Sequence, residues 1–223
     1  MPGDLYVLAA AILALCGLIL GNAWVATLSA AVAGIALHRA TRQGSSADAR
    51  RALLGGLVAG AVVATGDWGF VEARFLFHMR TEAPFAPISA GVEASRAILF
   101  SALLYSYVRL RMSRSAVVSV PVAAFIALCV GLAFEHLGTG AGLWDWNASL
   151  MPDRQVGAAW AFVPLAWAMS GACLWYFLMG FSRRVPLAFH PIGVGIRFGA
   201  AYLGFTMISY ALLLRVYGKV VME

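Results

Sequence analysis

The sequence predicts an all-α protein, a polytopic bundle of about seven transmembrane helices. Of its 223 residues, 62% are hydrophobic and only 12% are charged, whereas soluble domains are about a quarter charged. The charges gather in short clusters, and the apolar stretches between them are long enough to cross about 30 Å of hydrocarbon. These stretches are rich in Ala, Leu, Val and Gly without alternation, which argues against an outer-membrane barrel. An ordinary water-soluble domain is excluded.

The predicted spans follow one another along the whole chain. They are Leu5–Leu20, Ala23–His38, Ala52–Phe77, Ser89–Val108, Ala116–Leu137, Gly157–Phe181 and Val194–Val216. The first two together hold about 34 residues, too many for one crossing and few for two, so we expect a tight hairpin at Gly21-Asn22. Residues 1–223 then form one integral membrane domain: a hairpin (1–40), two repeat-like blocks (52–112 and 116–182) and a final helix (192–223).

The basic residues predict the orientation of these spans. The net charge of +6 comes almost wholly from arginine, since Lys219 is the only lysine. Three arginine-rich loops fall on one side of the seven-span arrangement: Arg39/Arg42/Arg50/Arg51, Arg109/Arg111/Arg114 and Arg183/Arg184. The positive-inside rule makes that side cytoplasmic. We therefore expect a protein of the cell (inner) membrane with a cytoplasmic N-terminus, and no nucleic-acid partner.

Ionisable residues within the spans are the most informative feature, because each costs on the order of 3 kcal/mol in lipid. If the third helix runs on to its predicted end, Asp67, Arg74 and His78 share one stripe, with Trp68 and Glu72 beside it. The fourth helix places Glu93 and Arg96 one turn apart. The fifth ends at Glu135 and His136, before a loop containing Trp144, Asp145 and Trp146. All of these fall in the predicted outer half of the bundle.

Two interpretations of these residues stay open. In the structural one, Glu93–Arg96 and Asp67–Arg74 are ion pairs that hold the bundle together, and the tryptophans form an ordinary interfacial belt. In the functional one, the carboxyls line a polar pocket open to the outer leaflet. The acids Asp67, Glu72, Glu93 and Glu135 outnumber the arginines Arg74 and Arg96. An unpaired buried carboxyl can act as a proton donor.

Metal and cofactor chemistry has little support in the sequence. His38, His78, His136 and His190 are distributed to both faces, without the spacing of a metal or haem site. The chain also lacks a phosphate loop and a dinucleotide fingerprint. We expect neither a metal nor a cofactor.

The chain contains an approximate internal repeat with an offset of about 70 residues. The first copy reads Ala64-Thr65-Gly66-Asp67-Trp68, then Ala90-Gly91-Val92-Glu93 and Phe100. The second reads Ala133-Phe134-Glu135-His136, then Gly142-Leu143-Trp144-Asp145-Trp146-Asn147, then Val163-Pro164-Leu165-Ala166-Trp167. Each copy is a helix, an acid near its end, a connecting segment and a returning helix.

At these residues the chain resembles the small integral-membrane lycopene cyclase domains and the related carotenoid hydratase family. The resemblance rests on Gly142-Leu143-Trp144-Asp145-Trp146, Gly157, Pro164-Leu165, Gly91-Val92-Glu93 with Phe100, and Glu135-x-x-Gly138-Thr139. It covers residues 60 to 180. Two departures stand out: Ala166-Trp167 follows Pro164-Leu165 where the family has a double acid, and Ala94 follows Glu93.

The resemblance implies an isoprenoid-handling membrane fold. Our leading hypothesis is an enzyme that cyclises or hydrates an end group of a lipid-soluble polyene. Glu93 would donate the proton, and Asp67, Glu72 or Glu135 would accept one or position water. Trp68, Trp144 and Trp146 would face the carbocation, while Arg96 and Asp145 complete the binding site. The alternatives are a non-catalytic membrane subunit or lipid- or pigment-binding protein of the same fold, and a proton-coupled transporter. Homo- and hetero-oligomers both remain open.

Overall fold

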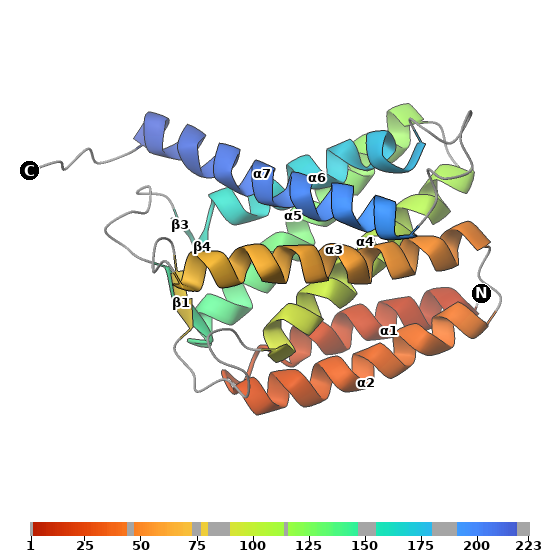
Figure 1. Ribbon diagram of the computed structural model, residues 1–223, viewed down its shortest axis with the longest axis horizontal. Coiled ribbons are helices and arrows are strands. Elements are labelled where there is room, and N and C mark those ends of the chain that lie inside the picture. Colours follow the sequence, from red (N-terminus) through yellow and green to blue (C-terminus); the bar gives the residue numbers. More distant parts are fainter. Residues whose placement is uncertain are drawn as a thin grey trace, which may run out of the picture.

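A computed structural model describes residues 2–43, 47–72, 77–79, 90–113, 116–146, 155–179 and 191–217. These residues form seven helices that run side by side in one bundle (Figure 1). The helices are α1 (Pro2–Cys16), α2 (Ala23–Arg42), α3 (Ala47–Glu72), α4 (Ala90–Ser113), α5 (Ala116–Gly140), α6 (Phe162–Met179) and α7 (Pro191–Tyr217). By length and composition α2, α3, α5 and α7 can cross a membrane, and α1 and α6 are shorter apolar helices. The predicted polytopic helix bundle is confirmed.

The first two helices form the predicted tight hairpin. Gly21 has a φ of 60°, a left-handed conformation that glycine adopts without steric cost. Asn22 then caps α2, because its side-chain oxygen accepts hydrogen bonds from the backbone N–H groups of Trp24 (2.9 Å) and Val25 (3.3 Å). Helix α1 ends at Cys16, four residues before the predicted end of that span.

Helix α3 packs against α4 through small residues. A side chain at Gly56 would collide with Ser101, and one at Gly60 would collide with Ala97. The Ser101 hydroxyl also donates a hydrogen bond to the backbone carbonyl of Leu53 (2.8 Å). Small residues allow two membrane helices to approach closely, and a hydroxyl can then bond across the contact.

Helix α7 packs on another face of α3, also through glycines. Gly195 and Gly199 are four residues apart and therefore lie on one face of α7. A Cβ atom at Gly195 would meet Val58, and one at Gly199 would meet Val62. Helix α3 is thus held between α4 and α7 at close range.

Two short strands lie where the repeat predicts connecting segments. Strand β1 (Phe77–Met79) follows α3, strand β2 (Trp144–Trp146) follows α5, and they pair antiparallel with His78 opposite Asp145. The helix contacts also correspond: Gly60 of α3 meets Ala97 of α4, and Gly131 of α5 meets Trp167 of α6. Two repeats would produce such matched contacts, but the repeat itself stays a prediction.

Two boundary differences change the predicted site. Helix α3 ends at Glu72 and β1 follows it, so the predicted helical stripe from Asp67 to His78 is wrong. Aromatic residues, which are frequent in the sequence near residue 77, favour strands, and β2 provides the strand with which β1 pairs. Helix α6 begins at Phe162 and not at Gly157, which has a φ of 62° in the turn between β3 (Gln155–Val156) and β4 (Ala159–Trp160).

Aromatic side chains fill the core where α4, α6 and α7 meet. The ring of Phe100 lies 4.7 Å from that of Trp167, 5.3 Å from Phe198 and 5.1 Å from Tyr202, measured between centroids. Trp167 also contacts Phe134 of α5, at 6.1 Å. These rings begin one helical turn beyond Arg96 on α4, next to the candidate site.

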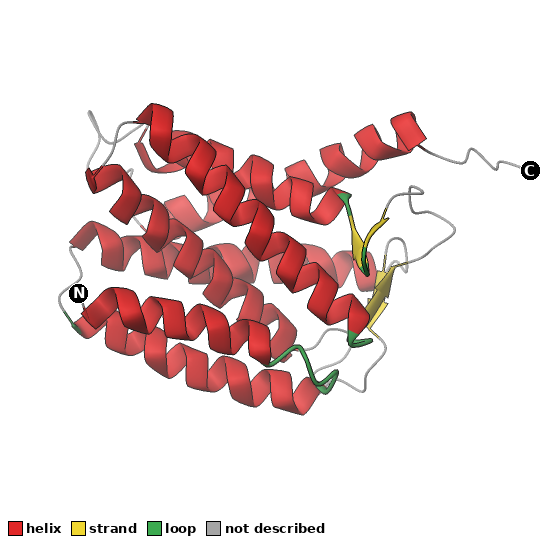
Figure 2. Ribbon diagram, turned by 180° about the vertical axis from the view of Figure 1, so that it is seen from behind, coloured by secondary structure: helices red, strands yellow, loops and turns green. Residues whose placement is uncertain are grey.

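The two ends of the bundle differ in character. All four described strands lie at one end, and the end of α2 and the start of α3 lie at the other (Figures 1 and 2). Helix α1 begins at the end of the bundle away from the strands, and α7 ends at the strand end (Figure 1).

Candidate functional site

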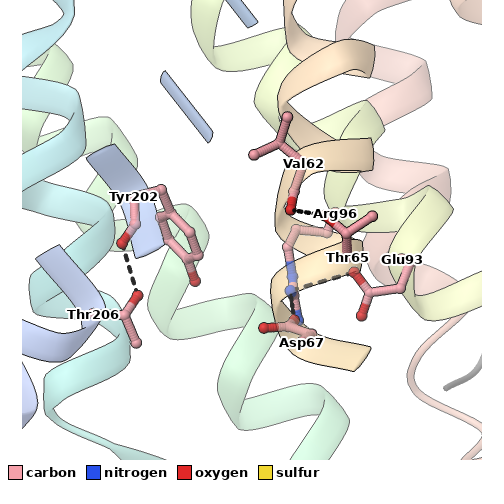
Figure 3. Close-up of polar contacts among 7 residues, drawn as sticks. All are labelled: Val62, Thr65, Asp67, Glu93, Arg96, Tyr202 and Thr206. Carbon is pink, nitrogen blue, oxygen red and sulfur yellow. Dashed lines mark hydrogen bonds and ion pairs between the residues drawn. The ribbon is translucent and has the colours of Figure 1, made fainter. Parts of the chain in front are cut away.

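The candidate site is built around Arg96, in the second turn of α4. Its Nη1 atom forms an ion pair and a hydrogen bond with Asp67 Oδ2, from the last turns of α3. The same nitrogen lies 3.3 Å from Glu93 Oε2, one turn earlier on α4. Figure 3 shows the three side chains gathered where α3 and α4 meet, with Tyr202 of α7 on the opposite side of the view. Arg96, Asp67 and Glu93 are only 6 to 7% exposed.

The two carboxyls are not equivalent. Asp67 accepts the hydrogen bond from Arg96, whereas neither carboxyl oxygen of Glu93 has a hydrogen-bond partner among the described residues. The Nε atom of Arg96 is also without one in this part of the chain. Because buried polar groups are nearly always hydrogen-bonded, the unsatisfied atoms mark this place as unusual.

A third buried acid, Glu135, lies near the end of α5. It is 1% exposed, and the indole N–H of Trp146 on β2 donates a hydrogen bond to its Oε1. Its neighbour Phe134 presents its ring to the Arg96 guanidinium, whose carbon lies 5.2 Å from the ring centroid. Glu135 also lies within electrostatic reach of Arg96 and Asp67. Among the described residues, Arg96 therefore contacts two carboxyls and a third lies within electrostatic reach of it.

Aromatic residues enclose this cluster on the core side. Tyr202 of α7 is buried and interacts electrostatically with Arg96, Asp67 and Glu135. Trp167 is fully buried, and its indole nitrogen has no hydrogen-bond partner among the described residues.

The loop end of the site is fixed to α5. The Thr139 hydroxyl donates a hydrogen bond to the carbonyl of Ala158 (2.7 Å), and the Ala158 N–H donates one to His136 Nδ1 (3.1 Å). The turn between β3 and β4 is thus attached next to Glu135. The His136 ring is thus used in this structural contact. Among the described residues, no three or more His, Cys, Asp or Glu side chains are placed to hold a metal ion.

The structure places the predicted site residues in three groups. The first group lies in the cluster, although no single sequence motif contains all of its members: Asp67, Glu93, Arg96, Glu135 and Trp146. Trp144 packs inside on Phe134 (5.2 Å), Asp145 is half-buried on β2, and Trp68 is 51% exposed at the end of α3. The side chains of Glu72 and His78, and Arg74 altogether, lie outside the described residues.

Three residues of the site were not predicted from the sequence. Phe134, Trp167 and Tyr202 were not among the predicted site residues, although Phe134 and Trp167 belong to the second copy of the predicted repeat. Their position in that repeat is the available signal, but the packing partner is needed to interpret it. Comparison with protein-family models, curated proteins and solved structures finds no match to this chain.

Proposed function

We propose that the protein is an integral membrane enzyme that cyclises or hydrates an end group of a lipid-soluble isoprenoid. Glu93 is the proton donor in this proposal. The observation that carries it is the contrast between the two carboxyls beside Arg96. Asp67 is hydrogen-bonded to the guanidinium, whereas the buried Glu93 forms an ion pair with it at 3.3 Å and neither of its oxygens has a hydrogen bond among the described residues.

The charge count of the cluster supports a proton-transfer role. Asp67, Glu93 and Glu135 face one arginine, and an uncompensated buried charge costs several kcal/mol. Protons held on the carboxyls remove that excess. A cluster that stores a proton on a residue without a structural hydrogen bond is suited to general acid catalysis.

The proposed reaction balances without an external oxidant or reductant. Glu93 donates its proton to one carbon of a terminal double bond, whose π electrons form the new C–H bond, and the neighbouring carbon becomes a cation. In cyclisation a second double bond of the same molecule supplies the electron pair for ring closure. In hydration a water oxygen supplies that pair. Either route then releases one proton, which Glu135 accepts, and the cycle closes when one proton has returned to Glu93.

The surrounding residues have distinct roles in this proposal. Asp67 holds Arg96 in place, and Glu135 accepts the released proton. Trp144 and Trp146 offer aromatic faces to the cation, each worth roughly 0.5–2 kcal/mol. The packed rings of the core keep water from quenching the cation early. No cofactor is required for these steps.

We place the protein in the cell (inner) membrane with the arginine-rich end of the bundle cytoplasmic. The described arginines at that end include Arg39, Arg42, Arg50 and Arg51 on the neighbouring ends of α2 and α3. The acid cluster, near the strands, then lies in the outer half of the membrane.

The test is expression of the chain in a bacterial host that accumulates lycopene, followed by chromatography and mass spectrometry of the extracted pigments. We expect a product with the mass of lycopene, or that mass plus one water. Glu93→Gln should lower its yield by a factor on the order of 100 or more. The folded amount of this variant should be unchanged, because Arg96 keeps its bond to Asp67.

A matched control uses another acid of the bundle. Asp48, in the first turn of α3, is exposed and pairs with Arg51 at 3.6 Å. Asp48→Asn should leave the yield unchanged. A well-folded Glu93→Gln protein with full yield would remove Glu93 from the mechanism. Absence of both a product and a copurified polyene would overturn the enzymatic proposal.

The second candidate function is a non-catalytic membrane subunit or pigment-binding protein of the same fold. Trp167 favours it, since a buried indole occupies the place where the resemblance predicts the second acid. The visible spectrum of the purified protein, together with the variants above, distinguishes the two: bound polyene that emerges chemically unchanged indicates the binding protein.

A further inference from the structure

A groove runs along α4 from Leu99, one turn beyond Arg96, to Arg109 at the arginine-rich end of the bundle. Helices α1 and α5 both pack on α4 and barely touch each other, which leaves a cavity of about 650 Å³ between them. Ligand sites in proteins have volumes of about 300–1,000 Å³. Its floor and walls are Leu99 and Leu103 of α4, Leu8 and Ala11 of α1, and Ile126 and Val130 of α5.

The length of the groove corresponds to one leaflet of a membrane. It extends along α4 from Leu99 to Arg109, ten residues, which at 1.5 Å per residue is about 15 Å. The hydrocarbon core of a bilayer is about 30 Å thick. An apolar chain in this groove would therefore reach from the membrane surface to its middle.

At the membrane-surface end of the groove, Asp4, Arg109 and Tyr105 form a hydrogen-bonded cluster. Arg109 holds Asp4 through two contacts, Nε to Oδ1 at 3.1 Å and Nη2 to Oδ2 at 3.2 Å. The Tyr105 hydroxyl donates a further hydrogen bond to Asp4 Oδ1 (2.7 Å). All three residues line the cavity, so it is apolar along its length and polar only at one end.

At the polar end of the groove the charge of Asp4 is matched by Arg109, and further basic residues come from the neighbouring end of α2. The start of α1 lies against the end of α2, since a Cβ atom at Gly3 would lie 3.4 Å from the carbonyl oxygen of Gln43. The last turn of α2 contributes Arg39 and Arg42, both exposed. Basic residues gathered at a membrane surface attract anionic lipids.

We propose that this groove binds one anionic phospholipid, with an acyl chain between α1 and α5 and the phosphate beside Arg109, next to the last turn of α2, which carries Arg39 and Arg42. The ligand has to be amphiphilic, because the cavity is polar at one end only and its apolar part is about as long as one membrane leaflet is thick. It has to be anionic because the arginines outnumber Asp4 there. This proposal does not depend on the reaction assigned to Glu93.

The test is native mass spectrometry of the full chain, released from detergent micelles that contain equal amounts of phosphatidylglycerol and phosphatidylcholine. We expect one bound phosphatidylglycerol per chain, at about ten times the level of bound phosphatidylcholine. Ala11→Phe, which fills the groove, should lower that adduct at least about fivefold. Arg109→Gln should leave a lipid bound but reduce the preference for phosphatidylglycerol.

The matched control is Ala31→Phe, at an exposed position on α2 away from the groove, which should keep the adduct. If Ala11→Phe does not elute as a folded protein, Ala11→Leu and Arg109→Gln provide the same comparison. Equal adducts of the two lipids, or an unchanged adduct in folded Ala11→Phe, would overturn the proposal. A dimer that Ala11→Phe dissociates would also overturn it, because the occupant would then be a second copy of the chain.

Discussion

Arg96 is the residue on which the buried cluster depends. It is bonded to Asp67 on α3, lies 3.3 Å from Glu93 on its own helix, and faces the ring of Phe134 on α5. One side chain thus connects three helices at the same depth. A buried ion pair of this kind is weak support for stability while it is intact, but removal of one partner leaves a buried charge without compensation.

Arg96→Gln should therefore destabilise the fold strongly. We expect a loss of about 3–5 kcal/mol in the free energy of unfolding, because Asp67 and Glu93 lose their shared cation. Reversible unfolding in mixed micelles measures the loss. The control Arg50→Gln alters an exposed arginine in the first turn of α3 and should stay within about 0.5 kcal/mol of the wild type.

The same measurement on Glu93→Gln separates the two roles of the cluster. If Glu93 is only a structural partner of Arg96, its loss should also lower stability by several kcal/mol. If Asp67 alone holds Arg96, Glu93→Gln should be nearly as stable as the wild type and defective only in chemistry. An Arg96→Gln protein with wild-type stability would contradict the structural role of the arginine itself.

At the scale of helices, α3 packs closely against both α4 and α7. Its glycines face α4, and the glycines of α7 face it in turn. Asp67 lies near the end of this helix, so the position of the site depends on how closely α3, α4 and α7 approach one another. Contacts of this kind are made by van der Waals packing, because lipid offers no hydrophobic driving force between helices.

Gly199→Leu should disrupt the contact between α7 and α3. A Cβ atom there would lie 2.8 Å from the backbone carbonyl oxygen of Ala59 and 2.9 Å from Val62, so the helices have to separate. We expect a loss of about 1–3 kcal/mol, the usual cost of overpacking. Thermal unfolding in detergent measures it.

The matched control lies on the same helix. Gly204 has no atom within 4 Å of an added side chain. Gly204→Leu should be neutral or slightly stabilising, because leucine is the better helix former. Equal losses in the two variants would mean that the effect comes from α7 itself and not from its contact with α3.

Local patterns explain which elements could be predicted. Apolar run length predicts each helix, and the Gly21-Asn22 turn follows from the conformational preferences of those two residues. Strand β1 could not be predicted, because its residues continue an apolar run and only the partner strand β2 gives them a different conformation. The spacing of Glu93 and Arg96 predicts a local contact, and the structure contains it.

At the scale of the whole molecule, the site depends on contacts that are distant in sequence. Asp67 and Arg96 are 29 residues apart, and their meeting follows from the packing of glycines between α3 and α4. Tyr202 comes from the last helix and Trp167 from the one before it. Nothing in an apolar helix distinguishes such an aromatic residue from its core neighbours, so sequence patterns alone could not assign these two.

The orientation of the molecule is the prediction with the widest consequence. Gln43 and Gln155 are both exposed, the first at the end of α2 and the second on β3 at the opposite end of the bundle. We replace the three native cysteines, Cys16, Cys129 and Cys173, by serine, and introduce Gln43→Cys or Gln155→Cys singly. A maleimide that cannot cross membranes should label the cysteine at 155 in intact cells, and the cysteine at 43 only after the cells are opened, because arginine-rich ends stay inside.

The opposite labelling pattern would invert the bundle and move the acid cluster into the inner half of the membrane. The groove at Arg109 would then open on the outer leaflet. The contacts of Arg96 with Asp67 and Glu93 would be unchanged, since they depend only on helix packing. What changes is the source of protons, because the cluster near the strands exchanges protons with the compartment on its own side of the membrane. The labelling result therefore decides which compartment's pH would affect the reaction proposed for Glu93.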